Sequence, residues 1–276
     1  KDCHAQSKLL VFIHTSFLLP LIKELTISNQ LISSLKIITS LSIEILFEII
    51  SGLSFIKTSY ICAMILSTEI AEKIAKSLLQ IKAIKLEPKK PFKWASGWNS
   101  PIYCDNRITL SYPDLRAYIT KQLSYGISKK YGKVDVIAGV ATGAIAQGAL
   151  IAKDLNLPFI YVRSNNKEHG RKNLIEGYIE KKQNIVVIED LISSGKSSLF
   201  AVNTLREAGH NIKGMAAIFS YGFKNAKENF LKNKCDFFTL SNYECLIQEA
   251  LKIKYISQNE LSILKKWSEN PSKWDI

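Results

Sequence analysis

Two adjacent carboxylates, Glu189 and Asp190, stand directly before a run of small and hydroxyl-bearing residues in the segment IVVIEDLISSGKSS, residues 185–198. Carboxylates can accept hydrogen bonds from sugar hydroxyls, whereas serine hydroxyls and loop amides can donate hydrogen bonds to a phosphate. The combination indicates a site for a sugar phosphate. An ordinary strand–loop–helix unit whose acids bind nothing remains the alternative interpretation of this segment taken alone.

The elements around these residues would hold them in place. Residues 185–188 are all β-branched, which predicts a short buried strand, and a helix is expected to begin near Lys196 or Ser197. The positive end of that helix dipole would then face the phosphate.

A nucleotide-binding P-loop is the rival interpretation, because Gly195-Lys196-Ser197 matches the end of the pattern GxxxxGK[ST]. The first glycine of that pattern falls at Asp190, whose carboxylate would repel the phosphates that the loop must wrap. We therefore reject a P-loop.

The composition is ordinary for a globular protein of 276 residues, with 47% apolar and 22% charged residues. The formal net charge of +13 favours an anionic partner, but lysine supplies most of it and no basic helix is interleaved with aromatic residues, so nucleic-acid binding is not expected. The five cysteines lack CxxC spacing and the four histidines form no ligand pattern, which predicts reduced thiols in a cytoplasmic protein and no zinc site.

Residues 1–63 differ from the rest, being rich in Ile, Leu and Ser and lacking arginine. The apolar region 37–56 is long enough to span a bilayer, but Glu44 and Glu48 would lie at a costly depth. We expect residues 1–63 to be an extension outside the functional domain, and translation from upstream of a true start at Met64 is one origin for it. The alternative is a pair of membrane-associating helices.

Strand and helix signals alternate through residues 134–253, which predicts an α/β fold with a parallel sheet. A helix is expected from Ser67 or Thr68, and a second from a capping box at residues 111–114 to Tyr131, ending at Gly132. The other predicted elements are strands 134–138, 158–163, 185–188, 212–220 and 236–240, helices 144–155, 197–208, 224–232, 243–253 and 259–268, and a tight loop at 139–143.

Two further segments are distinctive. Residues 92–107, FKWASGWNSPIYCDNR, alternate aromatic residues with a glycine and a proline, which predicts twisted strands that form a flap. Residues 164–173, SNNKEHGRKN, are so polar that they predict an exposed mobile loop.

Together these segments resemble the type I phosphoribosyltransferases. The acidic loop 189–197 resembles their phosphoribosyl pyrophosphate (PRPP) motif, residues 92–107 resemble the hood of the orotate phosphoribosyltransferases, and residues 163–170 resemble the catalytic loop of that group. The resemblance covers residues 64–276 and implies a parallel sheet flanked by helices with a small N-terminal hood. The implied parts are a hood at about 64–110, a PRPP-binding α/β core at about 111–255 and a C-terminal helix at about 256–276.

The resemblance implies transfer of ribose 5-phosphate from PRPP to orotate, giving orotidine 5′-phosphate and pyrophosphate in pyrimidine biosynthesis. Lys167 and Asp190 are the expected catalytic residues, and Ser193 is expected to contact orotate as well as PRPP. The full PRPP-binding set that the resemblance implies is Arg163, Lys167, His169, Glu189, Asp190, Leu191, Ile192, Ser193, Ser194, Gly195, Lys196 and Ser197.

The same resemblance implies Mg²⁺ held mainly by PRPP and water, and a cytoplasmic homodimer in which the mobile loop 163–173 is shared across the interface. No membrane contact is expected for residues 64–276. A phosphoribosyltransferase for another base and a non-catalytic PRPP sensor are the alternatives. Two departures leave questions open: Lys196 could strengthen phosphate binding or crowd the helix start, and with Ala95 in the hood the orotate carboxylate is left to backbone amides, Lys93 or Arg107.

Overall fold

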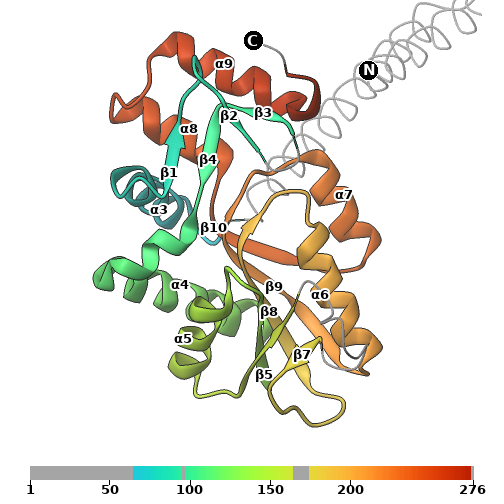
Figure 1. Cartoon of the computed structure of the whole chain (residues 1–276). Helices are drawn as coiled ribbons and strands as arrows, with labels where there is room; N and C mark the ends of the chain where they lie inside the picture. Colours follow the sequence, from blue (N-terminus) through green and yellow to red (C-terminus); the bar gives the residue numbers. More distant parts are fainter. Residues whose placement is uncertain (1–64, 95–96, 164–173, 275–276) are drawn as a thin grey trace, which may run out of the picture. The chain divides into compact units, whose positions relative to one another are not determined.

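The computed structural model describes residues 65–94, 97–163 and 174–274 (Figure 1). Its central element is a six-stranded sheet in the order β10-β9-β8-β5-β6-β7. All neighbouring strands run parallel except β7, which pairs antiparallel with β6 at one edge. The strands are β5 (Val136–Val140), β6 (Phe159–Val162), β7 (Ile175–Glu176), β8 (Asn184–Ile192), β9 (Asn211–Ser220) and β10 (Phe237–Asn242).

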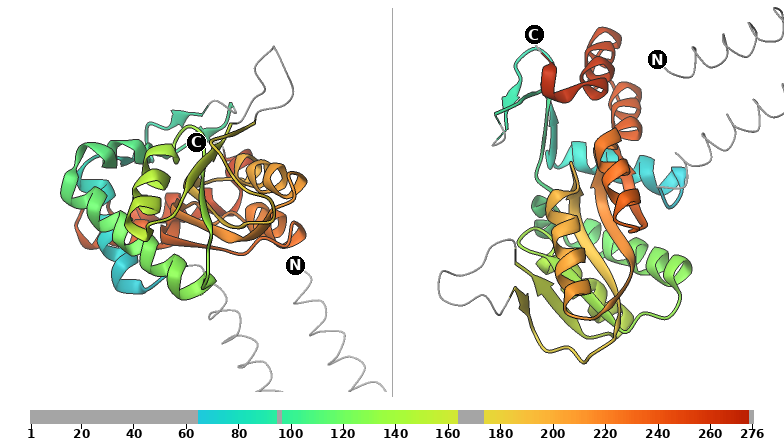
Figure 2. Two further views of the ribbon diagram at one scale, coloured as in Figure 1. Left: turned by 90° about the horizontal axis from the view of Figure 1, so that it is seen from below. Right: turned by 90° about the vertical axis from the view of Figure 1, so that its right-hand side faces the viewer.

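Helices cover both faces of this sheet (Figures 1 and 2). On one side lie α4 (Pro113–Tyr131) and α5 (Ile145–Leu155), and on the other lie α6 (Lys196–Glu207) and α7 (Lys224–Lys232). The central strands are therefore buried on both faces, and every residue of β5 is buried. At the β10 edge, α3 (Thr68–Gln80) packs against β10 and α8 (Tyr243–Lys252). The sequence-based expectation of a parallel α/β sheet is confirmed.

The hood consists of two small antiparallel pairs, β1 (Ile84–Leu86) with β4 (Ile102–Cys104) and β2 (Phe92–Lys93) with β3 (Asn99–Ser100). The C-terminal helix α9 (Gln258–Glu269) and the 3₁₀ helix η2 (Pro271–Lys273) lie at the same end of the molecule (Figure 1). Trp267 of α9 is fully buried and its ring lies 5.8 Å from that of Trp94. The hood and the C-terminal helix thus share one aromatic cluster.

Some local expectations are confirmed. The side chain of Ser67 caps α3 by accepting a hydrogen bond from the amide of Ile70, and α4 ends at Gly132, whose φ is +63°. The predicted bounds of α5, α6, α7, α8 and α9 agree with the structure to within a residue.

Three local expectations are wrong. No capping box starts α4, because Ser111 ends a 3₁₀ helix, η1 (Asn106–Ser111), and α4 begins at Pro113 with no side-chain cap. The loop predicted at residues 139–143 begins only after Val140, because β5 continues to that residue beside β6. Strand β8 runs four residues beyond the predicted end at Ile188, because its ladder with β9 continues to Ile192 and Ser220.

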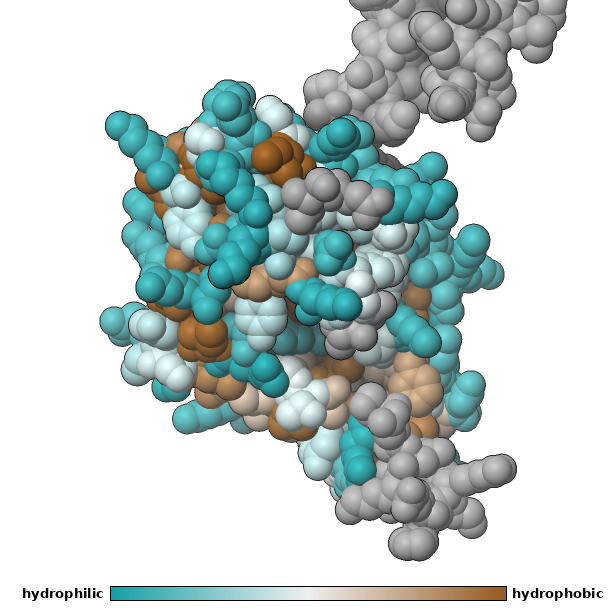
Figure 3. Space-filling view, turned by 45° about the horizontal axis from the view of Figure 1, so that its top comes forward, coloured by the Kyte–Doolittle hydropathy of each residue, from teal (hydrophilic) through white to brown (hydrophobic). Residues whose placement is uncertain are grey.

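Strands β1 and β7 were not predicted, because two or three residues carry too little periodicity to be recognised. Hydrophilic side chains cover much of the face seen in Figure 3, with apolar residues in small separate patches. No helix in the described ranges is long and apolar enough to cross a bilayer. The predicted boundary near Met64 lies among residues whose structure is not described, and it stays a prediction.

Candidate active site

The two acids of the opening motif lie in the last part of β8 and have different surroundings. Glu189 is buried, with 4% of its surface exposed, whereas Asp190 is only partly buried. The two acids, adjacent in the sequence, therefore lie in different environments in the structure. The two carboxylates still lie close enough that the charge of Asp190 raises the pKa of Glu189.

Glu189 points toward helix α6. Its Oε2 accepts a hydrogen bond from the hydroxyl of Ser198 at 3.0 Å, and its Oε1 accepts one from the backbone amide of Asp190 at 3.1 Å. Burial raises the pKa of the Glu189 carboxyl well above 4.5, and the neighbouring Asp190 raises it further. Both carboxylate oxygens are therefore used inside the protein, and the ribose-binding role expected for Glu189 stays a prediction.

Asp190 faces the loop that follows β5. A Cβ atom added to Gly143 would lie 2.5 Å from Cγ of Asp190, so the absence of a side chain at this glycine lets the carboxylate approach the loop backbone. The same loop contains a cis peptide bond between Ala141 and Thr142. Two segments that the sequence analysis treated separately, the acidic motif and the loop after β5, therefore meet at the carboxylate of Asp190.

The predicted phosphate loop, residues 191–197, runs from the end of β8 into the first turn of α6. Gly195 is the N-cap residue with φ +77°, and a Cβ atom there would lie 2.7 Å from the ring of Phe230, so both the conformation and the space require glycine. The loop and the first turn of the helix are therefore held in the geometry in which unpaired amides can bind an anion. Lys196 is the first residue of α6 and is exposed, so it does not crowd the helix start.

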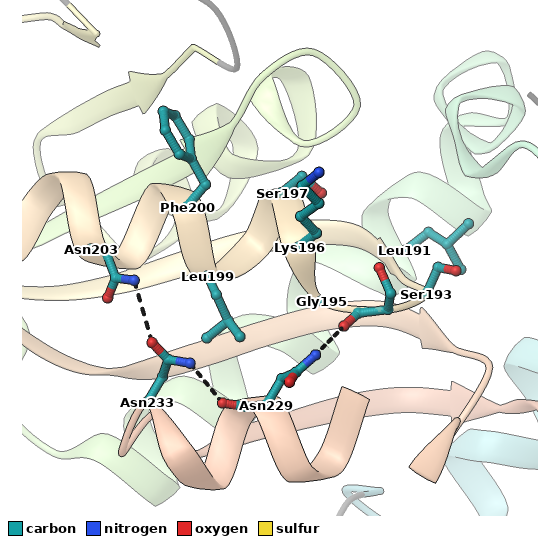
Figure 4. Close-up of a pocket in the computed structure, with 11 residues that line it drawn as sticks. Leu191, Ser193, Gly195, Lys196, Ser197, Leu199, Phe200, Asn203, Asn229 and Asn233 are labelled. Carbon is teal, nitrogen blue, oxygen red and sulfur yellow. Dashed lines mark hydrogen bonds between the residues drawn. The ribbon is translucent and has the colours of Figure 1, made fainter. Parts of the chain in front are cut away.

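A pocket of about 840 Å³ lies along this loop and continues between α6 and α7 (Figure 4). Asparagine side chains form a hydrogen-bonded series on its wall. Asn203 donates to Oδ1 of Asn233 at 3.3 Å, Asn233 donates to the carbonyl of Asn229 at 2.8 Å, and Asn229 donates to the carbonyl of Ser194 at 3.4 Å. Asn229 of α7 thus supports the loop through the carbonyl of Ser194. The lining residues are Leu191, Ser193, Ser194, Gly195, Lys196, Ser197, Leu199, Phe200, Asn203, Asn229 and Asn233.

Arg163 follows the end of β6, and its Nη1 lies 3.2 Å from Oε1 of Glu176 in β7. The side chains of Arg163 and Glu176 are partly exposed, at 27% and 34%. Lys167 and His169 lie outside the described residues, so their placement beside Arg163 stays a prediction. The structure therefore places one member of the expected pyrophosphate-binding set and pairs it with a carboxylate.

Trp94 of the hood packs against the protein core. Its indole nitrogen donates to the carbonyl of Ile102 at 3.0 Å, and its ring lies 5.2 Å from that of Tyr221. Cys104 is half-buried and its thiol donates to Oδ1 of Asn106 at 3.4 Å. Burial raises the pKa of this thiol, and Asp190 and Asp105 raise it further, which agrees with an unreactive structural cysteine.

Sequence reasoning missed the residues that brace the motif: Ser198, Asn229 and Asn106. Ser198 could have been found, because it lies one helical turn from the loop. The two asparagines had no local signal, because they come from segments far away in the sequence. In the described ranges no group of three His, Cys, Asp or Glu side chains could hold a metal ion by itself.

Comparison with known proteins gives a consistent result. The model of the phosphoribosyl transferase domain family matches residues 114–253. The orotate phosphoribosyltransferase of Phocaeicola vulgatus is 54% identical over 201 residues, covering 73% of this chain and 95% of that protein. The Cytophaga hutchinsonii enzyme of the same name is 54% identical over 203 residues, covering 74% and 97%.

Solved structures share the fold. Leishmania donovani UMP synthase superposes with a TM-score of 0.62 at 26% identity, covering 72% of this chain and 42% of that one. Aeropyrum pernix orotate phosphoribosyltransferase superposes with a TM-score of 0.59 at 23% identity, covering 67% and 99%. The fold is thus that of the type I phosphoribosyltransferases. With half of its length matched by the domain model and relatives above 50% identity, the chain belongs to the orotate phosphoribosyltransferase family.

Proposed function

We propose that this protein transfers the ribose 5-phosphate group of PRPP to orotate, giving orotidine 5′-phosphate and pyrophosphate in the de novo synthesis of pyrimidines. The observation that carries the proposal is the junction at the end of β8. There the partly buried Asp190 is followed by a loop whose conformation requires Gly195 and which ends at the N-terminus of α6. Membership of the orotate phosphoribosyltransferase family supports orotate as the base.

Different residues of the junction bind different parts of the substrate. Residues 191–197 bind the 5-phosphate through backbone amides, serine hydroxyls and the helix dipole, and Ser193 also contacts orotate. Glu189 and Asp190 accept hydrogen bonds from the ribose hydroxyls, and the internal hydrogen bonds of Glu189 also fix the strand end to α6. The hood covers the base and excludes water.

The chemistry requires charge of both signs. As the bond to pyrophosphate breaks, the anomeric carbon gains cationic character and the leaving group gains negative charge. The carboxylate of Asp190 stabilises the sugar side. On the leaving-group side, Arg163, Lys167 and His169 bind pyrophosphate, and Lys167 stabilises the developing charge. Closure of the loop 163–173 excludes water, which would otherwise hydrolyse PRPP.

We place this loop in a homodimer, where it reaches the site of the partner subunit. The support is the position of Arg163 at the start of the loop and the exposure of Tyr178, 84%, on the segment that follows β7. Mixing Lys167→Ala and Asp190→Asn subunits tests the arrangement, because active hybrid sites form only if the loop is shared. Absence of recovered activity under conditions of subunit exchange would contradict it.

Mg²⁺ is expected to enter with PRPP. PRPP oxygens and water would supply most of its ligands, and no direct protein ligand is expected. The ion would neutralise pyrophosphate charge. Three cysteines in the described ranges, Cys104, Cys235 and Cys245, are free thiols, which supports a reducing, cytoplasmic compartment.

The decisive experiment follows the PRPP-dependent loss of orotate absorbance with the purified full chain. We expect turnover with orotate, and its dependence on Mg²⁺ is checked by adding a chelator. Turnover with a different base but not orotate would identify another phosphoribosyltransferase. Tight PRPP binding with no turnover on any base would favour a sensor.

A further inference from the structure

Asn106 joins the hood to the end of β8. It begins the 3₁₀ helix η1, is 2% exposed, and its side-chain Nδ2 lies 2.6 Å from the carbonyl oxygen of Asp190, 84 residues away in the sequence. This hydrogen bond reaches the backbone of the residue whose carboxylate faces the loop after β5.

The orientation of the Asn106 amide is fixed from its own side. Its Oδ1 accepts a hydrogen bond from the thiol of Cys104 at 3.4 Å, which leaves Nδ2 as the group that faces Asp190. Its backbone carbonyl accepts a hydrogen bond from the hydroxyl of Thr109 at 2.6 Å. Asp105 caps the same helix by accepting from the amide of Arg107. The asparagine is therefore held rigidly in the hood.

The hydrogen bond of Asn106 adds to the strand pairing of β8. The register of β5 with β8 ends at the pair Gly139 and Ile188, whereas the register of β8 with β9 continues to Ile192 and Ser220. Beyond Ile188 the ladder of β8 therefore continues only with β9, and Asn106 supplies a further hydrogen bond to this strand end from the hood. A second fixed contact restricts the orientation of the Asp190 peptide.

We propose that Asn106 is a positioning residue that holds the peptide of Asp190, so that the hood over the base and the carboxylate at the ribose keep one geometry. The inference rests on the proposed function. It implies that removing the Nδ2 donor harms the use of PRPP even when the protein stays folded, because small displacements of a group at the reacting carbon are costly.

The test compares Asn106→Leu, which keeps similar volume without the donor, with Ser241→Ala as the matched control. Ser241→Ala removes a buried hydrogen bond to the carbonyl of Ala71 and contacts neither Asn106 nor Asp190. We expect kcat/KM for PRPP to fall about tenfold or more in Asn106→Leu, mostly through kcat, and to change less than about twofold in Ser241→Ala. Urea unfolding of both variants shows whether they lose comparable stability.

A second readout does not depend on activity. Amide hydrogen exchange of residues 189–192, measured by mass spectrometry, is expected to be faster in Asn106→Leu than in Ser241→Ala. If Asn106→Leu unfolds, Asn106→Asp replaces it, because it keeps the size and presents oxygen instead of a donor. Folded Asn106 variants with wild-type exchange and wild-type kcat/KM would overturn the inference, whereas an inactive wild type would overturn the proposed function instead.

Discussion

The hydroxyl of Ser198 donates a hydrogen bond to Oε2 of Glu189 across 3.0 Å, inside the protein and away from the loop that we assign to the phosphate. Ser198 belongs to the first turn of α6, so the bond fixes the helix N-terminus to the end of β8. Two adjacent acids that look equivalent in the sequence thus have different surroundings: Glu189 is bonded to α6, and Asp190 faces the loop after β5.

Replacing Glu189 by Gln should make protein stability less sensitive to pH. The pKa of Glu189 is raised in the folded protein, so the folded state holds this proton more tightly than the unfolded state. Wild-type stability is therefore lost as pH rises from about 4.5 through the raised pKa, and Glu189→Gln lacks this loss. Urea unfolding of both proteins across this range measures the difference. Parallel pH profiles would contradict the assignment.

Gly143→Ala should abolish most activity while leaving the fold intact. The added Cβ atom would lie 2.5 Å from Cγ of Asp190, so the carboxylate must move away from its position beside the loop. We expect kcat to fall about a hundredfold, the scale typical of a misplaced group at the reacting centre. Steady-state kinetics and circular dichroism check the two parts. Near-normal kcat would show that the position of Asp190 is not critical.

Lys196→Ala should weaken PRPP binding and slightly stabilise the free protein. A cation at a helix N-terminus opposes the helix dipole by about 0.3–1 kcal/mol, but it attracts a bound phosphate. Lys224 provides a matched control, because it is also the exposed first residue of a helix, α7, and it does not line the phosphate pocket.

We expect Lys196→Ala to raise KM for PRPP about threefold to tenfold, with a smaller effect at high salt, where charge interactions are screened. Lys224→Ala should leave KM unchanged. Equal effects of the two substitutions would mean that only net charge affects PRPP binding. No effect of either would mean that Lys196 is a solvated surface lysine with no role in PRPP binding.

The sequence predicts much of this fold because its longer elements carry strong local signals. The β-branched run before Glu189 predicted the strand, and the segment after Gly195 predicted the start of α6. The structure confirms both. The predicted end of this strand was wrong because Glu189 and Asp190 are polar, and only their pairing with β9 extends the strand past them. Polar residues are weak local predictors of a strand when a neighbouring strand decides the outcome.

The site was predictable only in part, for a related reason. The motif residues share a short segment, but their supports do not. Asn106 reaches Asp190 across 84 residues, and Asn229 reaches Ser194 across 35. No periodicity or spacing connects an asparagine in the hood, or one on α7, with a loop after β8. Such contacts depend on tertiary packing.

Asn229→Ala should loosen the phosphate loop without affecting the base site. It removes the donor to the carbonyl of Ser194, at 3.4 Å, and a single hydrogen bond of this kind is worth about 0.5–1.5 kcal/mol. We expect KM for PRPP to rise about twofold to tenfold, with KM for orotate unchanged. Asn203→Ala is the control, because Asn203 is the far end of the same series and does not contact the loop. Matching effects of the two would argue for general loosening of the interface between α6 and α7.

Glu176→Gln should strengthen inhibition by the product pyrophosphate. Arg163 lies 3.2 Å from Glu176, and this carboxylate competes with pyrophosphate for the guanidinium. A partly exposed pair of this kind contributes about 1 kcal/mol or less, so the inhibition constant should fall by up to about fivefold, while Arg163→Ala should raise it. Glu180→Gln removes the same charge from an exposed position on the following segment and controls for net charge. If both glutamine variants bind pyrophosphate equally tightly, the effect comes from long-range electrostatics. Arg163 then does not exchange Glu176 for pyrophosphate.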